Sequence, residues 1–273
     1  MTVTVYAATA ANLERTPLTG PSLDAVSLQL PAGVYTTART YAGRRIVGLS
    51  AHLNRLADSH TRLGRRSGPP LDLAGLRAIL RAVLEQAAQP EVRLRLTVPF
   101  EGERVYISVE PFEAFPAACY TQGVACATTR LERENPLAKS TAFIAAASAA
   151  RAGAAVHELL RVDAAGRLLE GVSSNFFVVL EGVLRTAGAG VLEGVTRQVV
   201  LAQAAGLITV ALEPVRVADL AGAAEAFITS ASREVMPIVR IDEHVIGAGR
   251  PGPVTLELLA RYRAHLLETS EVP

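Results

Sequence analysis

Residues 133–141 read RENPLAKST, and Lys139 in this stretch is the only lysine of the 273-residue chain. The other 26 basic residues are arginine. A guanidinium stays protonated and cannot act as an amine nucleophile, whereas a lysine can lose its proton and form a Schiff base with an aldehyde. Lys139 is therefore a candidate for amine chemistry. Composition alone fits equally well a genome bias that replaced every other lysine with arginine, so the surrounding sequence must decide.

Length and composition exclude several classes of protein. At 273 residues, 50% hydrophobic and 19% charged, the chain has enough apolar surface to fold as one large or two modest domains. The net charge of +1 offers no positive field for nucleic acid. No apolar run approaches the ~18 residues of a membrane span, and the first residues do not resemble a signal peptide. We therefore expect a cytoplasmic protein without nucleic-acid or membrane partners.

The residues that commonly bind metals or form disulfides are scattered. Cys119 and Cys126 form neither a CxxC pair nor a disulfide framework, which favours two reduced structural thiols. The five histidines lack metal-ligand spacing, and no P-loop, HExxH or GxSxG motif is present. The sequence therefore predicts no metal site.

Hydrophobic periodicity predicts an α+β chain in two halves. Strands are expected at 33–47 (two, around a turn), 91–98, 104–110, 123–129, 156–162, 167–170, 175–180, 183–186, 208–212, 225–229 and 238–246. Helices are expected at 51–63, 72–88, 140–153, 196–205 and 253–267. The stretch 111–123 contains two prolines and shows weak periodicity, which makes it the best candidate for a linker. We therefore predict a smaller N-terminal α/β domain at 1–113, a linker at 114–122 and a larger, β-rich domain at 123–273.

Several residues in addition to Lys139 are of types that could bind an aldehyde bearing a phosphate group. Arg55 could bind a phosphate, and Glu170 could hold a pyridinium nitrogen. Free N–H groups at a helix start suit an anion. The residues that offer such N–H groups or hydroxyls are Val195, Thr196, Ser230, Ala231 and Ser232. Each also has an ordinary reading, as a solvated arginine, a loop carboxylate, a helix start or a turn.

The order of these motifs resembles the class IV, fold-type IV pyridoxal-phosphate enzymes, which include branched-chain aminotransferases, D-amino acid aminotransferases and aminodeoxychorismate lyases. The resemblance runs from about residue 33 to about residue 267. Five motifs carry it: HLNRL (52–56), RENPLAKST (133–141), EGVSSNFF (170–177), LEGVTR (192–197) and FITSASREVMP (227–237).

The resemblance implies a two-domain fold of the D-amino acid aminotransferase type, with pyridoxal 5'-phosphate in the cleft and held mostly by the C-terminal domain. It implies Lys139 as the Schiff-base lysine and Glu170 as the ring-nitrogen partner. It places the phosphate on Arg55, on Val195 and Thr196, and on Ser230, Ala231 and Ser232. Two positions depart from the family pattern, because Ala142 stands where Asn is frequent and Ala231 stands where Thr is frequent.

The strand that begins at Gly33 favours one reaction within this family. Strand alternation places Tyr35, Thr37 and Arg39 on one face, which in the family looks into the active site. The phrase Thr-Thr-Ala-Arg looks more like aminodeoxychorismate lyase, in which a threonine at the Thr37 position assists catalysis. We therefore expect conversion of 4-amino-4-deoxychorismate to 4-aminobenzoate and pyruvate, with Lys139 and Thr37 as catalytic residues. A plain strand-forming threonine is the ordinary alternative.

Other readings remain open. The main alternative is an aminotransferase for branched-chain or D-amino acids that uses 2-oxoglutarate. A silent pyridoxal-phosphate binder and a cofactor-free interaction protein are further alternatives. Arg95, with Tyr35 and Arg39, is a candidate for binding a small-molecule amine substrate, although Arg93 and Arg95 could instead line a solvated edge. By analogy with the family we expect a homodimer.

Overall fold

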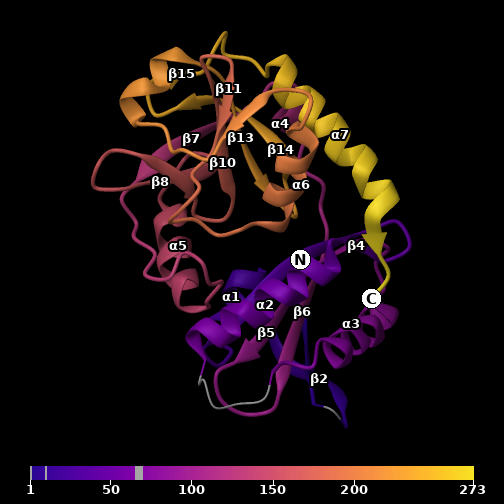
Figure 1. Cartoon of the computed structure of the whole chain (residues 1–273). Coiled ribbons are helices and arrows are strands. Elements are labelled where there is room, and N and C mark those ends of the chain that lie inside the picture. The colour runs from indigo at the N-terminus through magenta and orange to yellow at the C-terminus, as the bar shows by residue number, and fades with distance from the viewer. Residues whose placement is uncertain (1, 10, 65–69) are drawn as a thin grey trace. The chain divides into compact units, whose positions relative to one another are not determined.

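The computed structural model describes residues 2–9, 11–64 and 70–273. The chain forms two compact units (Figure 1). The first unit comprises residues 1–113, 138–148 and 268–273, and the second comprises residues 114–137 and 149–267. Lys139 therefore belongs to the first unit, although it follows the predicted N-terminal domain by more than twenty residues.

A seven-stranded sheet forms the centre of the first unit, in the order β16-β4-β3-β5-β6-β1-β2. Its strands are β1 (Val3–Ala8), β2 (Leu13–Gly20), β3 (Gly33–Tyr41), β4 (Arg45–Val47), β5 (Val92–Pro99), β6 (Val105–Pro111) and β16 (Ser270–Glu271). All pairings of neighbouring strands in this sheet are antiparallel. The C-terminal strand β16 thus completes a sheet built otherwise from the first 111 residues.

Helices cover both faces of this sheet. The buried leucines of α2 (Leu49–Leu63) and α3 (Leu73–Gln86) pack on Val34, Ala38 and Leu94. On the other side, Leu23 and Val26 of α1 (Leu23–Ser27) pack on Val3 and Val5. Side chains alternate along a strand, so Thr36 shares the α2 face with Val34 and Ala38, while Tyr35, Thr37 and Arg39 lie on the opposite face. The expected common face of these three residues is present.

The second unit contains a closed barrel. Strands pair in the order β10-β13-β14-β7-β8-β9, and β9 returns to β10 through Glu170 and Asn175. These strands are β7 (Val124–Thr129), β8 (Glu158–Val162), β9 (Leu168–Gly171), β10 (Asn175–Leu180), β13 (Ala223–Ser230) and β14 (Glu234–Ile241). The short strands β11 (Val183–Arg185), β12 (Thr209–Ala211) and β15 (His244–Val245) extend this sheet. Apolar side chains such as Phe176, Ile228 and Met236 form a buried core among its strands.

Five helices complete the described chain beyond the first sheet. They are α4 (Ala118–Thr121), α5 (Ala142–Ala152), α6 (Val195–Ala204), the 3-10 helix η1 (Val217–Gly222) and α7 (Pro253–Thr269). Both α5 and α7 contain residues of each unit, because the division falls after Ser148 and after Leu267.

The structure divides the chain differently from the three segments expected. The boundary after Glu113 coincides, but the expected linker at 114–122 contains α4 and belongs to the second unit. Residues 138–148 and 268–273 join the first unit by sheet pairing, which local sequence does not reveal. The expected strand at 238–246 is two strands, because Asp242 takes a left-handed conformation with φ of 50°.

Both cysteines are free thiols. Burial, reinforced by the negative charge of Glu158, raises the pKa of the Cys126 thiol and keeps it protonated at neutral pH. Across residues 2–9, 11–64 and 70–273, no helix is both long and apolar enough to cross a bilayer. The same ranges contain no cluster of three His, Cys, Asp or Glu side chains suited to a metal ion.

Candidate active site

The backbone around Lys139 is fixed to the start of β3. Tyr35 N–H donates to the Lys139 carbonyl over 2.9 Å, and Thr141 N–H donates to the Gly33 carbonyl over 2.9 Å. Gly33 N–H donates in turn to the Thr141 hydroxyl over 2.9 Å. A Cβ at Gly33 would lie 2.2 Å from the Val98 carbonyl oxygen, so only glycine allows β3 to approach β5 this closely at the point where the Lys139 segment pairs. The Lys139 segment therefore pairs with the start of β3 through a single antiparallel bridge between Ser140 and Val34.

The Lys139 side chain lies beside an aromatic ring. Its Nζ is 4.9 Å from the centroid of Tyr35, which is 8% exposed. The Lys139 N–H donates to the Ser59 hydroxyl over 3.2 Å, and Ser59 is held by the Arg55 carbonyl on α2. The amine is thus presented on a backbone fixed from β3 on one side and from α2 on the other.

Arg55 belongs to a chain of polar contacts on the α2 face. Its Nη2 donates to the Thr36 hydroxyl over 3.0 Å, and that hydroxyl lies 2.8 Å from His52 Nδ1. Arg55 Nη2 is also 3.4 Å from His52 Nδ1. Because a guanidinium can only donate, His52 Nδ1 accepts, and the ring is neutral with its proton on Nε2. Burial, and then the charges of Arg55 and Lys139, hold the pKa of His52 well below its ordinary value.

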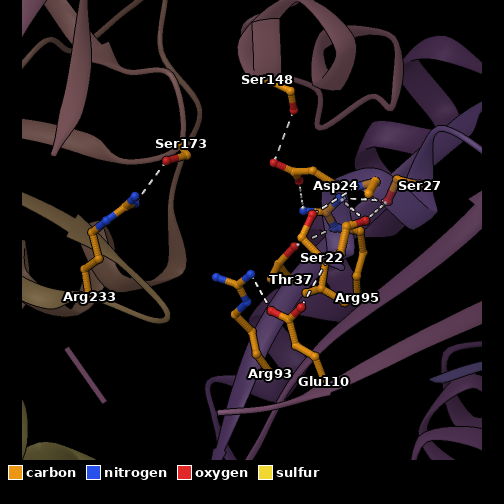
Figure 2. Close-up of polar contacts among 12 residues, drawn as sticks. Ser22, Asp24, Ser27, Thr37, Arg93, Arg95, Glu110, Ser148, Ser173 and Arg233 are labelled. Atoms are coloured by element: carbon orange, nitrogen blue, oxygen red, sulfur yellow. Dashed lines mark hydrogen bonds and ion pairs between the residues drawn. The ribbon is translucent and has the colours of Figure 1, made fainter. Parts of the chain in front are cut away.

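Arg95 is engaged by neighbours on the opposite face of the sheet (Figure 2). Its Nη2 forms an ion pair with Asp24 over 2.7 Å, and its Nη1 donates to the Ser27 hydroxyl over 2.7 Å. Its Nε donates to the Thr37 hydroxyl over 3.2 Å, and the Tyr35 ring centroid lies 4.5 Å from its guanidinium carbon. Arg95 is 6% exposed. The charge of this candidate substrate residue is therefore already matched by Asp24.

The two neighbouring arginines also have partners. Arg39 forms an ion pair with Glu91 over 3.2 Å and stacks on the rings of Tyr41 and Phe112. Arg93 forms an ion pair with Glu110. The register places Arg39 opposite Arg93 and Thr37 opposite Arg95, so the arginines line one face of β3 and β5. Of the candidate substrate residues, Tyr35 also contacts the amine of Lys139.

Glu170 is the buried charge at the closure of the barrel in the second unit. Its Oε1 accepts from Arg133 Nη1 over 3.2 Å and from Arg161 Nη1 over 3.0 Å. Its Oε2 accepts from Asn175 Nδ2 over 3.3 Å and from the Leu192 N–H over 2.9 Å. Two guanidinium groups and two neutral donors thus surround this side chain, which is only 2% exposed.

Backbone N–H donors lie at the start of α6. The N–H groups of Val195 and Thr196 have no intrahelical acceptor, as in the first turn of any α-helix, and the N-cap Gly194 provides no capping side chain. A Cβ at Gly194 would lie 2.1 Å from Asn175 Oδ1, so this helix start lies against the strand that follows Glu170. Among the described residues, the buried Thr229 hydroxyl, paired in register with Asn175, has no hydrogen-bond partner.

The loop after β13 is a tight hairpin. Ser230 pairs with Glu234, which leaves Ala231, Ser232 and Arg233 in the turn. Glu234 adopts a φ of 57°, the left-handed conformation that closes such three-residue turns. Arg233 N–H donates to the Ser230 hydroxyl over 3.2 Å. The candidate phosphate residues Ser230, Ala231 and Ser232 therefore share one short, closed turn.

Several residues that contact Arg95, Arg55 or Glu170 were not singled out in the sequence. Asp24 lies in α1, a short helix without clear periodicity, and its contact with Arg95 is 71 residues distant. His52, Arg133 and Asn175 lie inside the quoted motifs, and their position beside Arg55, Lys139 and Glu170 is a signal that could have identified them. Arg161 carried no such signal.

Comparison with known proteins identifies similar chains. The family model described as amino-transferase class IV matches residues 33–241. A probable branched-chain-amino-acid aminotransferase of Thermotoga maritima is 30% identical over 253 residues, which cover 89% of each chain. The D-alanine aminotransferase of Bacillus licheniformis is 39% identical over 94 residues, 33% of each chain.

Solved structures show the same fold. A crystal structure from Thermotoga maritima, also assigned as a branched-chain amino acid aminotransferase, has a TM-score of 0.80, 28% identity and 96% coverage of each chain. The branched-chain aminotransferase of Thermoproteus uzoniensis with norvaline has a TM-score of 0.77 at 24% identity, covering 97% of this chain and 96% of that one. Both likenesses support the fold-type IV architecture expected from the sequence.

The described side chains fit pyridoxal phosphate by charge and type. Lys139 supplies an amine, Arg55 a guanidinium, and the start of α6 N–H groups without intrahelical acceptors. The orphaned Thr229 hydroxyl offers a further donor. Glu170 supplies carboxylate oxygens, although these already accept four hydrogen bonds, so a pyridinium N–H would share an oxygen with one of the present donors.

Replacement of Glu170 by Gln should destabilise the fold strongly. Arg133 and Arg161, each with a 7% exposed side chain, would lose their shared negative partner, and breaking such a buried pair costs about 3 kcal/mol or more. Urea unfolding measures the loss. The matched control is Glu213→Gln, whose partner is Arg185 in an exposed pair, with an expected change below about 0.5 kcal/mol. Equal losses in both variants would contradict the assignment of Glu170 as a buried hub.

Folding stability should depend on the protonation of His52. Its folded pKa is lowered, so the unfolded chain binds the proton more readily and stability falls as pH drops below about 6.5. Urea unfolding at pH 7.5 and 5.5 should show a loss that is about 1 kcal/mol smaller in His52→Gln than in the unaltered protein. Identical pH slopes for the two proteins would show that His52 does not titrate in this way.

Proposed function

Because the chain belongs to the class IV aminotransferase family and is a pyridoxal-phosphate-dependent enzyme of that family, we propose that it transfers the amino group of branched-chain or D-amino acids to 2-oxoglutarate. The observation that carries this proposal is the 30% identity over 89% of both chains to a relative named as a branched-chain-amino-acid aminotransferase. The relative named as a D-alanine aminotransferase supports the same reaction class. These names favour the aminotransferase alternative over the lyase that the Thr36–Arg39 phrase suggested.

Lys139 is the proposed attachment and proton-transfer residue. Pyridoxal phosphate, when bound, withdraws electrons from the carbon that bears the substrate's amino group. The Lys139 amine, the chain's single amine side chain, then takes the proton from that carbon. It delivers the proton to the carbon that came from the cofactor's aldehyde group. A fixed backbone serves this role, because the Lys139 amine must detach from the cofactor, transfer the proton and attach again from the same position. The bonds from Tyr35 and Ser59 provide that fixation.

The other proposed contacts follow from charge. Arg55 and the N–H groups of Val195 and Thr196 hold the phosphate, together with Ser230, Ala231 and Ser232. Glu170 accepts from the protonated ring nitrogen, and the ion pairs with Arg133 and Arg161 hold Glu170 in place. Tyr35, Arg39 and Arg95 stay proposed substrate contacts, although the charges of both arginines are already matched.

One contact favours a second candidate function, the lyase that forms 4-aminobenzoate and pyruvate. The Thr37 hydroxyl accepts a hydrogen bond from Arg95 Nε, a group that can only donate. The Thr37 proton is therefore directed away from Arg95 and is available for a substrate. A threonine oriented in this way could protonate a departing pyruvate. We also propose a homodimer acting on a small-molecule amine, as expected for this family.

Replacement of Lys139 by Ala should abolish amino transfer while preserving the fold. The chain has no second lysine to substitute for it, and Lys139 makes its fixing hydrogen bonds through backbone atoms that alanine retains. Steady-state transfer from valine or D-alanine to 2-oxoglutarate, with the urea midpoint as the folding control, measures both effects. Transfer at the unaltered rate without added amine would refute the assignment.

The two candidate reactions separate in a single comparison. The purified holoenzyme receives L-valine, D-alanine or 4-amino-4-deoxychorismate, each with and without 2-oxoglutarate. An aminotransferase should form glutamate only when 2-oxoglutarate is present, and Thr37→Ala should alter its rate little. Multiple turnovers to 4-aminobenzoate and pyruvate without any keto acid, lost in Thr37→Ala, would establish the lyase instead.

A further inference from the structure

The second unit contains another buried carboxylate, Glu158, at the start of β8. Its side chain is fully buried. Its Oε2 accepts from the Ser173 hydroxyl over 2.6 Å and from the Ser174 hydroxyl over 3.0 Å. It also accepts from the Ser173 N–H over 3.3 Å, while Oε1 accepts from the Leu159 N–H over 3.0 Å. Glu158 thereby fixes the turn between Glu170 and Asn175.

Arg233 supplies the positive charge that faces Glu158. Its Nη1 lies 3.5 Å from Glu158 Oε2. The same Nη1 donates to the Ser173 hydroxyl over 3.0 Å (Figure 2). Its Nε donates to His157 Nε2 over 3.3 Å, and its guanidinium carbon lies 5.9 Å from the Phe115 ring centroid. Burial and the Arg233 charge lower the pKa of His157, which suits a neutral ring accepting this hydrogen bond. The guanidinium is thus held from several sides.

The backbone around this pair is closely packed. A Cβ at Gly171 would lie 2.1 Å from the Ser174 hydroxyl and 2.9 Å from Glu158 Cγ. A side chain at this position would displace the Ser174 hydroxyl and the Glu158 side chain, and glycine leaves both in place. Arg233 itself is the last residue of the three-residue turn that contains Ala231 and Ser232. The pair consequently joins two segments that are 60 residues apart in sequence.

We propose that Glu158 and Arg233 form a positioning pair, which holds the Ser230–Ser232 turn in fixed relation to the turn that follows Glu170. This inference rests on the proposed function, because it assigns the first turn to the phosphate and Glu170 to the ring nitrogen. Neither Glu158 nor Arg233 is required to touch the cofactor. Their effect is to keep the phosphate donors and the carboxylate at one spacing.

Loss of the Glu158–Arg233 pair should reduce the protein's preference for pyridoxal phosphate over pyridoxal. General destabilisation of the fold would not change that preference. Pyridoxal lacks the phosphate but retains the aldehyde and the ring nitrogen. If Arg233 positions the phosphate turn, its loss weakens binding of pyridoxal phosphate more than binding of pyridoxal. A protein that is merely less stable would lose affinity for both compounds in proportion.

The experiment measures the affinity of the apoprotein for pyridoxal phosphate and for pyridoxal by absorbance titration. In Arg233→Met the ratio of the two affinities should fall about tenfold or more, a loss typical of removed supporting groups. Arg233→Lys should give an intermediate ratio, because one ammonium cannot reach Ser173, Glu158 and His157 together. The control Arg185→Met, which removes an exposed pair with Glu213, should leave the ratio unchanged.

The double variant Glu158→Gln, Arg233→Met separates positioning from folding. Removing both charges avoids an unpaired buried carboxylate, so the urea midpoint should recover towards that of the unaltered protein. The affinity ratio should stay low. Recovery of the ratio together with the midpoint, or an unchanged ratio in Arg233→Met, would overturn the inference. If the unaltered apoprotein fails to bind either compound, the proposed function fails instead.

Discussion

The hydrogen bonds between Gly33, Tyr35 and the segment 139–141 are the contacts on which the proposed chemistry depends. They add the Lys139 segment to the edge of β3 and so fix the backbone that carries the chain's only amine side chain. Gly33 is required there, since any larger residue would collide with the Val98 carbonyl. The segment therefore belongs to the first unit, although the chain on either side of it belongs to the second. Position in sequence and position in the fold differ at the residue that matters most.

Charge in both units is arranged around buried groups. In the first unit a neutral His52 lies close enough to Arg55 and Lys139 for both to lower its pKa. In the second unit the carboxylates Glu170 and Glu158 are each held by arginine and by hydroxyl, amide or backbone donors. Arginine suits such sites because it stays charged when buried and its planar group reaches several acceptors. A composition with 26 arginines and one lysine thus separates structural charge from amine chemistry.

The sequence predicted most regular elements of the chain after residue 32, since periodicity and turn residues act locally. The helix at α3 began where Asp72 indicated, with the Asp72 carboxylate accepting from the Gly75 N–H. The elements β1, β2 and α1 were not predicted, because β2 is a largely polar edge strand that contains Pro17 and α1 is only five residues long. Their stability comes from pairing with β6 and from packing on the sheet, which are tertiary contacts.

In the candidate site, too, some residues could be predicted from local sequence, whereas their partners depend on tertiary contacts. Motif order proposes Lys139, Arg55 and Glu170 as site residues, but it does not reveal the charged partners that surround them. Asp24 neutralises Arg95 across 71 residues, and Arg161 supports Glu170 from a neighbouring strand. Such pairings follow from sheet register, which a single sequence does not specify. The choice between amino transfer and the lyase reaction is hidden from the sequence for the same reason. It depends on which charged groups near Thr37 and Arg95 already have partners in the fold.

The most direct test of the central claim is borohydride reduction of the purified holoenzyme, followed by peptide mass spectrometry. Reduction makes the link between an amine and an aldehyde permanent. We expect a pyridoxyl-phosphate group on the peptide that contains Lys139, at close to one group per chain. Stable bound cofactor with an unmodified Lys139 peptide, or modification confined to the amino terminus, would contradict it.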